Sequence, residues 1–268
     1  MDTGREVNIR KYLAMCGIDS RRKVEKLIRE GNIRINGRLA KPTDNVKIGV
    51  DRVTLGGKVL KPEPPVYILF HKPKGIITSK KDEKGRMTVM DMLRGVVMAN
   101  IFPVGRLDRD SEGLLLITND GDFADLMLHP RYGKEKIYEV FVDGHITAKD
   151  IKQMKEGVST GGELLKAKDV KILRKGMGKT LLEITLSEGK KRHIRRMLGA
   201  LGKKVITLKR ISFGPFTLKG IQKPGTYRFL TDKEIKNIVE PLKKQFYEKQ
   251  RTRKGRGNNH HRRRGGRR

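Results

Sequence analysis

The chain has 268 residues, and its 62 Lys and Arg against 30 Asp and Glu give a formal net charge of +32 at pH 7. A charge of this size and sign indicates a polyanionic partner. Cys16 is the only cysteine, which excludes an intramolecular disulfide and leaves no cysteine spacing typical of a metal site. No apolar run reaches the roughly 20 residues of a membrane span, and the charged first residues lack a signal-peptide core. We therefore expect a cytoplasmic protein without a metal.

The positive charge is spread over the whole chain. Ten basic residues lie in the last twenty positions, with glycine and asparagine and without an acid, so residues 243–268 are predicted to form a flexible basic tail. Without these ten, 52 basic residues remain against the same 30 acids, a net charge of +22. We therefore expect the folded part to bind nucleic acid as well. His260 and His261 are interpreted as RNA-contacting or inert residues rather than metal ligands.

Residues 1–60 have the pattern of a small domain with two helices followed by short strands. Asp19-Ser20 is expected to cap the second helix, which ends at Gly31, and Asn36-Gly37 predicts a tight hairpin turn. Cys16 lies on an apolar helical face and is expected in the core. The apolar positions that predict these elements are Ile9, Leu13, Cys16, Val24, Leu27 and Ile28 for the helices and Ile33, Ile35, Val46, Val53, Leu55 and Val59 for the strands.

The second helix of this domain has a basic face, which is either simply solvated or lies along an RNA backbone. In so basic a chain we favour RNA. The runs Tyr12-Leu13-Ala14, Ser20-Arg21-Arg22-Lys23 and Ile33-Arg34-Ile35-Asn36-Gly37 resemble the S4 RNA-binding domain. This resemblance implies RNA binding but no particular chemistry. The residues expected to contact RNA are Arg21, Arg22, Lys23, Lys26 and Arg29.

Residues 61–65 contain three prolines and are predicted to form a stiff, extended linker before a second domain at 66–242. Strands are expected at 66–70, 138–142 and 182–186, and a long apolar stretch runs from 96 to 104. Thr147 with Asp150 predicts a capped helix from about Ala148, a basic helix is expected over 192–198, and Thr231 with Glu234 caps a last helix. Strands and helices do not alternate regularly, so the predicted class is α+β.

The run Gly105-Arg106-Leu107-Asp108-Arg109-Asp110-Ser111-Glu112-Gly113 places acids and arginines directly before the apolar strand Leu114-Leu115-Leu116-Ile117. Charged groups beside a buried strand are often functional. Arg106 and Asp108 are two residues apart, so in an extended segment their side chains share one face. We therefore predict a site at Asp108.

This run has two other interpretations. Its spacing of acids imitates the start of a calcium-binding loop, but Asn119 occupies the position where such a loop needs a bidentate Glu, and an apolar strand follows in place of a helix. A solvated turn is the second alternative, and Asn119-Asp120-Gly121 is predicted to be such a turn.

Four motifs in order resemble those of a pseudouridine synthase, most closely the ribosomal-RNA synthases of the RsuA and RluB type, in which an S4 domain precedes the catalytic domain. The resemblance continues through Leu208-Lys209-Arg210-Ile211 and Lys223-Pro224-Gly225, and so covers nearly everything before the tail. It implies a mixed-sheet catalytic domain that isomerises uridine without a redox cofactor or any other cofactor. The four motifs are Lys72-Pro73-Lys74-Gly75, Gly105-Arg106-Leu107-Asp108 with Ser111 to Leu116, Lys136-x-Tyr138, and Glu188-Gly189 before His193-Ile194-Arg195-Arg196-Met197.

The resemblance implies that Asp108 is the catalytic aspartate, acting on a flipped-out uridine whose N1–ribose bond is broken and rejoined through C5. This chemistry needs an ionised carboxylate as nucleophile or base. Burial near Leu114 to Leu116 would raise the pKa of Asp108, so a cation must hold the group ionised. The counterpart of the family arginine is Arg195, whose planar guanidinium suits a carboxylate. Its alternative reading is a phosphate-facing arginine on a basic helix.

Further roles are implied by the same resemblance. Tyr138 stacks on the target base, or is only a core residue of its strand. Arg106 fills the space left by the flipped base, or forms a structural salt bridge. Lys72, His193 and Ile194 complete the expected substrate-binding set, although for Ile194 the core is favoured. His193 stands where the family usually has Gln, which leaves the role of that amide open. His129-Pro130 matches a family strand-end motif and is expected to be structural.

The rival hypothesis is a non-catalytic S4-type RNA-binding or ribosome-assembly protein. Asp108, Tyr138 and Arg195 together favour the enzyme. The expected partner is ribosomal RNA or an assembly intermediate, bound by a monomer. The basic tail modestly favours large-subunit RNA (RluB-like) over small-subunit RNA (RsuA-like), because such a tail adds salt-sensitive affinity but little sequence choice. Folded RNA shape and single-stranded bases are the features such a protein would recognise.

Overall fold

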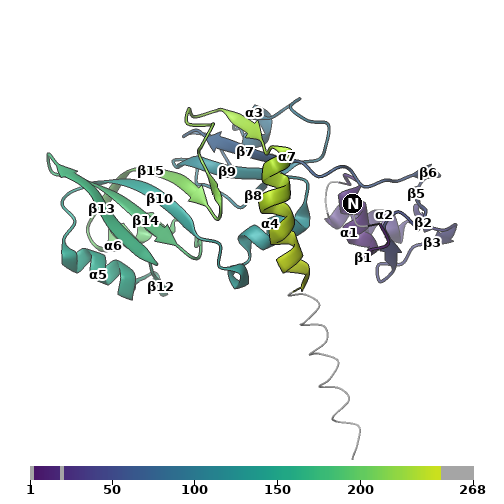
Figure 1. The fold of residues 1–268 in the computed structure, drawn as a ribbon, viewed down its shortest axis with the longest axis horizontal. Helices are drawn as coiled ribbons and strands as arrows, with labels where there is room; N and C mark the ends of the chain where they lie inside the picture. Colours follow the sequence, from purple (N-terminus) through teal and green to yellow (C-terminus); the bar gives the residue numbers. More distant parts are fainter. Residues whose placement is uncertain (1–2, 19–20, 249–268) are drawn as a thin grey trace, which may run out of the picture. The chain divides into compact units, whose positions relative to one another are not determined.

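The computed structural model describes residues 3–18 and 21–248 and has the mixed α+β character predicted from the sequence (Figure 1). It divides into two units. The first comprises the residues up to 67 together with Leu93–Phe102 and Thr118–Gly121, and the second comprises Ile68–Met92, Pro103–Ile117 and the residues from Asp122 onward. Two later segments therefore join the N-terminal unit, which the predicted boundary at 61–65 did not anticipate. Within the described ranges, no helix is long and apolar enough to cross a membrane.

The N-terminal unit contains the two helices and the short strands expected from its apolar spacing. Asn8 caps the first helix by accepting a hydrogen bond from the main-chain N–H of Arg10 at 3.1 Å. The cap predicted at Asp19-Ser20 lies outside the described residues. The elements are β1 (Glu6–Asn8), α1 (Ile9–Met15), α2 (Arg21–Arg29), β2 (Ile33–Ile35), β3 (Arg38–Leu39), β4 (Asn45–Lys47), β5 (Val53–Leu55) and β6 (Lys58–Val59).

Two tight turns order the strands of this unit. Asn36 and Gly37 both have positive φ, +50° and +84°, and Gly56 and Gly57 repeat the pattern at +53° and +83°. Turns of this hand match the twist of the strands they join, so each connects an antiparallel hairpin. The four strands lie in the order β3-β2-β5-β6. Cys16 packs against the core of this unit, and burial raises the pKa of its thiol to about 12.

Residues 61–65 form no regular element, but they are bound to their own unit. Glu63 donates its main-chain N–H to Met15 O at 2.8 Å, and its carboxylate accepts from the N–H of Asn100 at 3.1 Å. Asn119 donates to Pro64 O at 2.9 Å. The segment is therefore fixed by hydrogen bonds within the N-terminal unit as well as by its prolines.

The second unit is built on one mixed sheet that passes through the strands in the order β13-β14-β10-β15-β9-β7-β17, with β16 beside β15 and β8 beside β9. The strands are β7 (Tyr67–Lys72), β8 (Phe102–Val104), β9 (Glu112–Thr118), β10 (Lys136–Asp143), β13 (Asp169–Gly176), β14 (Lys179–Leu186), β15 (Lys204–Phe213), β16 (Phe216–Thr217) and β17 (Tyr227–Phe229), with a separate hairpin of β11 (Val158–Thr160) and β12 (Glu163–Leu165). The helices are α3 (Val89–Met92), α4 (Gly121–Leu128), η1 (Pro130–Tyr132), α5 (Ala148–Glu156), α6 (His193–Ala200), α7 (Asp232–Glu234) and η2 (Ile235–Val239).

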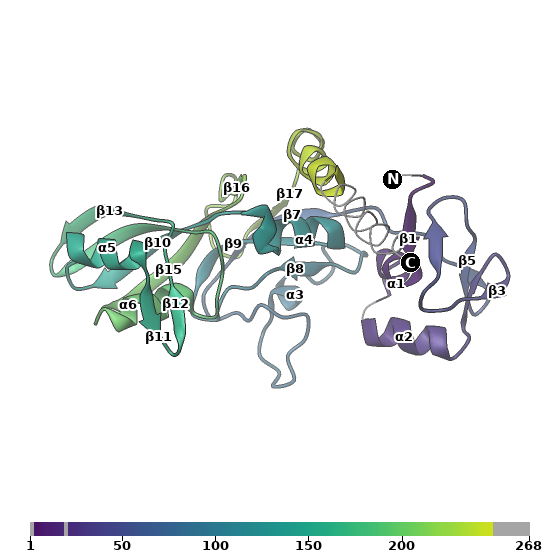
Figure 2. The ribbon, with the colours of Figure 1, turned by 90° about the horizontal axis from the view of Figure 1, so that it is seen from below.

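Helices α5 and α6 lie beside β10, β13, β14 and β15, as Figures 1 and 2 both show. Buried and less buried residues alternate along β10 and β14, which directs one face of each strand toward these helices. Met154 of α5 and Met197 of α6 belong to the same apolar cluster as Val140 and Leu182. The capping boxes predicted at Thr147 with Asp150 and at Thr231 with Glu234 are both present.

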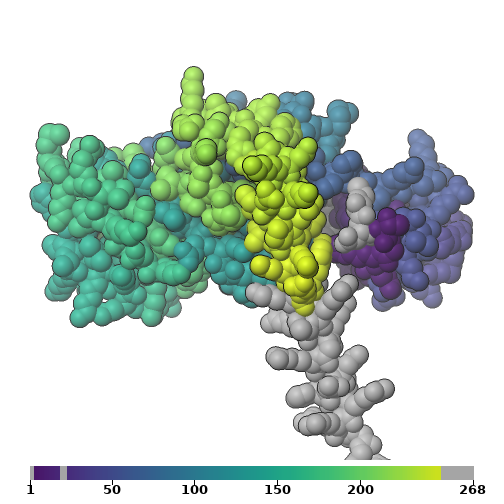
Figure 3. All heavy atoms as spheres, viewed as in Figure 1, coloured from purple at the N-terminus to yellow at the C-terminus, as the bar shows by residue number. Residues whose placement is uncertain are grey.

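Two predictions about local structure were wrong. The run Asn119-Asp120-Gly121 leads directly into α4, because Gly121 begins a helix where the sequence suggested only a turn. The tail predicted from residue 243 begins too early, since residues 240–248 are helical and Phe246 is 2% exposed. Tyr247 donates to the carboxylate of Asp122 at 2.8 Å, so this segment, yellow in Figure 3, packs on its own unit. The remainder of the predicted tail, 249–268, lies outside the described residues.

Gly113 allows the two halves of the large sheet to meet. Strands β9 and β15 are parallel and pair through Glu112 with Lys209 and Gly113 with Arg210. Gly113 has a φ of +113°, and a Cβ placed there would collide with the main chain of Arg210. Only glycine accommodates both the backbone angle and the close approach.

We predict that Gly113→Ala destabilises the protein by about 3 kcal/mol or more, because the added methyl group meets main-chain atoms that cannot move aside. The matched control is Gly121→Ala at the start of α4, where a Cβ has no neighbour within 4 Å, and its effect should stay within about 1 kcal/mol. Urea unfolding of the two variants measures both values. Equal stability of the two variants would contradict this account of the β9–β15 contact.

Candidate active site

Asp108 lies in the loop between β8 and β9, and it is more exposed than the sequence suggested. Its side chain is 35% exposed, whereas the preceding Leu107 is 6% exposed. The predicted burial against Leu114 to Leu116 was wrong, because those residues lie inside β9 while Asp108 stands before the strand begins. The carboxylate therefore remains accessible to a ligand from solvent.

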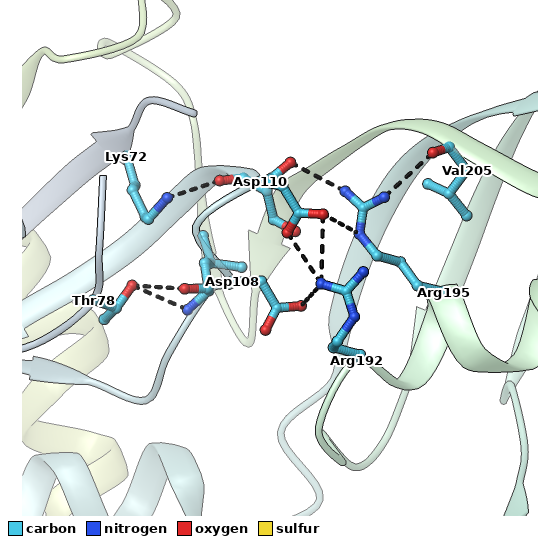
Figure 4. Close-up of polar contacts among 9 residues, drawn as sticks. Lys72, Thr78, Asp108, Asp110, Arg192, Arg195 and Val205 are labelled. Carbon is cyan, nitrogen blue, oxygen red and sulfur yellow. Dashed lines mark hydrogen bonds and ion pairs between the residues drawn. The ribbon is translucent and has the colours of Figure 1, made fainter. Parts of the chain in front are cut away.

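The loop that carries Asp108 is bound to the segment that follows β7. Lys72 donates to Ser111 O at 2.8 Å, and Thr78 donates to Leu107 O at 2.8 Å (Figure 4). Between them, Gly75 donates its N–H to Arg109 O at 2.8 Å. The segment from Lys72 to Thr78 thus supports the Asp108 loop at Leu107, Arg109 and Ser111.

Two arginines from the start of α6 face the acidic loop. Arg192 approaches Asp108 at 4.0 Å and Asp110 at 3.3 Å, and Arg195 contacts Asp110 at 3.2 Å through Nε. Arg195 also donates to the main-chain oxygen of Asp110 at 3.0 Å and to Val205 O at 3.3 Å. Figure 4 shows both guanidinium groups directed at the loop. Arg195 forms its ion pair with Asp110, and the charge of Asp108 acts on it as a smaller influence, while Arg192 pairs with Asp108. The role of Arg195 toward Asp108 stays a prediction.

The electrostatics of this cluster are balanced. Arg195 has a side chain only 12% exposed, and burial lowers its pKa, an effect that the negative charge of Asp110 opposes. An arginine keeps its proton at neutral pH even so. Arg192 is more exposed. It is the residue directly before α6, and its φ of +50° is not helical. Two carboxylates and two guanidiniums therefore share one small region.

Lys72 lies beneath the loop and not on its surface. The side chain is 0% exposed and donates to Pro73 O at 3.0 Å in addition to Ser111 O. Burial lowers its pKa to about 8, while Asp108, Asp110 and Glu112 act in the opposite direction. The ammonium is therefore mainly charged at pH 7. The structure places Lys72 as a support of the loop, and its contact with substrate stays a prediction.

Tyr138 is a buried residue of β10. It is 8% exposed, is paired with Ile184 on one side and Arg210 on the other, and belongs to the same apolar cluster as Leu107. Tyr138 is therefore connected to the Asp108 loop by packing in the core, through the cluster that includes Leu107. The alternative interpretation, a strand core residue, describes its present surroundings.

His193 and Ile194 begin α6, and each is 3% exposed. Burial lowers the pKa of His193, so its imidazole is neutral at pH 7. Ile194 lies in the core, as favoured from the sequence. Direct contact with substrate stays a prediction for both residues. Arg106, in contrast, is exposed beside Asp108.

The basic face of α2 is solvent-exposed where it is described. Lys26 and Arg29 have side chains 75% and 78% exposed, and Lys23 is exposed as well. Glu25 lies 3.9 Å from Arg29, and Glu30 lies 3.7 Å from Lys26, so part of the positive charge is compensated along the helix. The side chains of Arg21 and Arg22, two further predicted RNA contacts, lie outside the described ones.

Three residues of the site were not assigned a role from the sequence. Asp110 belonged to the quoted acidic run, but its spacing alone suggested only a false calcium loop. Arg192 opened the expected basic helix without a signal that set it apart from its neighbours. Thr78 had no signal, because its partner Leu107 is distant in sequence.

Two family models match the sequence: RNA pseudouridylate synthase over residues 66–200 and the S4 domain over residues 9–51. An uncharacterized RNA pseudouridine synthase of Aquifex aeolicus (strain VF5) is 40% identical over 240 residues, which are 88% of this chain and 95% of that protein. Ribosomal large subunit pseudouridine synthase B of Bacillus subtilis (strain 168) is 36% identical over 232 residues, covering 86% of this chain and 94% of that protein. A crystal structure of a pseudouridylate synthase shares 28% identity with a TM-score of 0.61, covering 86% of this chain and 98% of that one.

The mixed sheet, the supported acidic loop and the S4 unit define an RNA-modifying enzyme with a separate RNA-binding domain. The chain belongs to the RNA pseudouridine synthase family, whose members are isomerases. The family predicted from the ordered motifs, and the RNA-binding S4 domain with it, are confirmed.

Lys136 and Arg210 are two further buried cations of the second unit. Lys136 is 7% exposed and Arg210 is 2% exposed, and both lie over the ring of Phe213, at 5.0 and 4.9 Å from its centroid. Burial, and secondarily the charge of Arg210, lower the pKa of Lys136 from 10.5 to about 8. The folded protein therefore releases this proton at a lower pH than the unfolded chain does.

We predict that this lysine makes the folded protein more stable as the pH rises from about 8 toward 10.5, because the unfolded state then binds more protons than the folded one. The rise should be about 3 kcal/mol smaller in Lys136→Met than in wild type, because Lys72, whose pKa is also lowered to about 8, still contributes in the variant. Urea unfolding at several pH values measures the slope. Lys152→Met, at a position 74% exposed, controls for the loss of one lysine. An unchanged slope in Lys136→Met would contradict the prediction.

Proposed function

We propose that this enzyme isomerises a specific uridine of ribosomal RNA to pseudouridine, with Asp108 as the catalytic residue. The observation that carries the proposal is the accessible Asp108 carboxylate, held on a loop with buried supports and faced by Arg192 at 4.0 Å. The chemistry needs a carboxylate that the target nucleotide can reach, and the side chain of Asp108 is 35% exposed.

In the proposed reaction, the bond between N1 of uracil and C1′ of the ribose breaks, and a bond between C5 and C1′ forms. C5 loses a proton and N1 gains one, so the product has the same composition as the substrate and no electrons are exchanged. No redox cofactor is needed for this balance. The carboxylate of Asp108 acts as nucleophile or base toward the flipped-out nucleotide.

The remaining predicted residues take roles that fit their exposure. Arg106 is exposed beside Asp108 and fills the space that the uridine leaves in the RNA. Tyr138 forms the inner wall of the base site together with Leu107, since both belong to one apolar cluster. An aromatic ring can hold a base with about 1–3 kcal/mol, comparable with the cost of unstacking it. Exposed basic residues of α2, including Lys26 and Arg29, bind the RNA backbone.

Large-subunit ribosomal RNA is the proposed substrate. The name of the Bacillus subtilis relative at 36% identity supports this assignment, as does the basic composition of residues 249–268, which would add affinity for a large RNA. Small-subunit RNA is the alternative. We further propose that the enzyme acts as a monomer in the cytoplasm, on free ribosomal RNA or on an assembly intermediate.

Asp108→Asn is predicted to abolish pseudouridine formation while RNA binding stays within about twofold of wild type, because the amide keeps the shape of the side chain but cannot act as a nucleophile or base. Asp110→Asn is the matched control. Its carboxylate is 49% exposed, and an ion pair of that exposure contributes about 0.2–1 kcal/mol, so activity should fall by no more than about fivefold. Single-turnover assays on ribosomal RNA transcripts and filter binding give both quantities. Product formation by Asp108→Asn at the wild-type rate would remove the proposed mechanism.

Deletion of the gene is predicted to remove one or a few pseudouridines from large-subunit ribosomal RNA and none from small-subunit RNA. Chemical mapping of pseudouridine in cells with and without the protein measures this directly. Complementation with wild type should restore the modification, and complementation with the Asp108→Asn variant should not. Loss confined to the small subunit would instead establish the alternative substrate.

A further inference from the structure

Thr78 makes an unusual pair of contacts with the residue that precedes Asp108. Its hydroxyl donates to Leu107 O at 2.8 Å and accepts from the N–H of Leu107 at 3.3 Å (Figure 4). Thr78 is 3% exposed and Leu107 is 6% exposed, so both hydrogen bonds are shielded from solvent. One side chain therefore satisfies both main-chain polar groups of Leu107.

These bonds matter because Leu107 lies outside any strand. Its main-chain groups have no sheet partner, and a buried N–H or C=O without a hydrogen bond is costly. If the hydroxyl were absent, the loop would move until water or another group replaced it. Asp108 is the next residue, so such a movement would redirect its carboxylate.

The residues that follow Asp108 in the chain are held by groups other than Thr78. Gly75 and Lys72 hold Arg109 and Ser111, both of which follow Asp108 in the chain. Within the described residues, Thr78 is the side chain that fixes the residue immediately before it. The direction of Asp108 thus depends on a support at each side.

The segment around Thr78 is itself well fixed. Ile77 donates its N–H to Met87 O at 3.1 Å, and Val89 donates its N–H to Ile77 O at 2.9 Å. Ile77 also forms an isolated parallel bridge with Thr88. The two ends of the 79–88 loop are therefore joined by hydrogen bonds beside Thr78. This fixed position allows Thr78 to anchor Leu107.

We propose that Thr78 is a positioning residue for the isomerisation, acting through Leu107 to set the direction of the Asp108 carboxylate. This inference rests on the proposed catalytic role of Asp108. Displacements of about 1 Å in a catalytic group can reduce a rate by about 100-fold. The effect of losing the Thr78 hydroxyl falls on the chemical step, because Thr78 is too buried to touch RNA.

The test compares Thr78→Val, which removes the hydroxyl at nearly constant shape, with Thr78→Ser, which keeps it. Thr78→Val should lower kcat at least tenfold, with KM and RNA affinity within about twofold of wild type. Thr78→Ser should recover kcat to within about threefold. The matched control is Thr180→Val, since Thr180 is 0% exposed and its hydroxyl also bonds the main chain, donating to Gly144 O at 2.9 Å and accepting from the N–H of Ile146 at 3.3 Å. Thr180→Val should lose stability without losing kcat.

Several outcomes would overturn the proposal. These are a wild-type kcat in Thr78→Val, a failure of Thr78→Ser to recover it, and an equal loss in Thr180→Val. If Thr78→Val does not fold, as judged by thermal unfolding, Thr78→Ala is judged by the same criteria. Asp108→Asn is assayed beside them. An active Asp108→Asn variant defeats the proposed function, whereas an inactive one together with a fully active Thr78→Val defeats only the positioning role.

Discussion

The short parallel contact between β9 and β15 is the constraint on which the candidate site depends. The Asp108 loop directly precedes β9, and α6 with its arginines directly precedes β15. Because the two strands run in the same direction, the segments before them lie toward the same edge of the sheet. Gly113 makes this contact possible, and it belongs to the same motif as Asp108. The motif therefore encodes both the carboxylate and the backbone approach that brings cations to it.

The second requirement is a rigid loop beneath the carboxylate. A chain segment outside regular structure is ordinarily held by few hydrogen bonds and moves readily. Here Lys72, Gly75 and Thr78 each donate to the main chain of the loop, at Ser111, Arg109 and Leu107 respectively. The segment from Lys72 to Thr78 thus holds the loop from one side, while the side chain of Asp108 stays 35% exposed.

Local features of the fold followed from sequence, whereas contacts between distant segments did not. Asn36-Gly37, Thr147 with Asp150, and Thr231 with Glu234 were predicted correctly because each depends on residues at most three apart. The ion pairs of Asp108 and Asp110 were not predictable because Arg192, directly before α6, and Arg195, within it, are close in sequence, and only the packing of α6 decides which arginine reaches which acid. The exposure of Asp108 was misjudged for a related reason. Apolar neighbours in sequence bury the strand they form, not the loop before it.

The charge balance of the cluster explains how a carboxylate can face a polyanion. Asp108 and Asp110 would repel RNA phosphates if they stood alone. Arg192 and Arg195 cancel their charge at contact distance, and Lys72 adds a positive charge beneath the loop. Approaching RNA therefore meets a local region without net negative charge, within a protein whose excess of basic residues attracts it. Equal numbers of acidic and basic residues would not cancel the local charge unless the pairs were in contact. The β9–β15 contact brings them together.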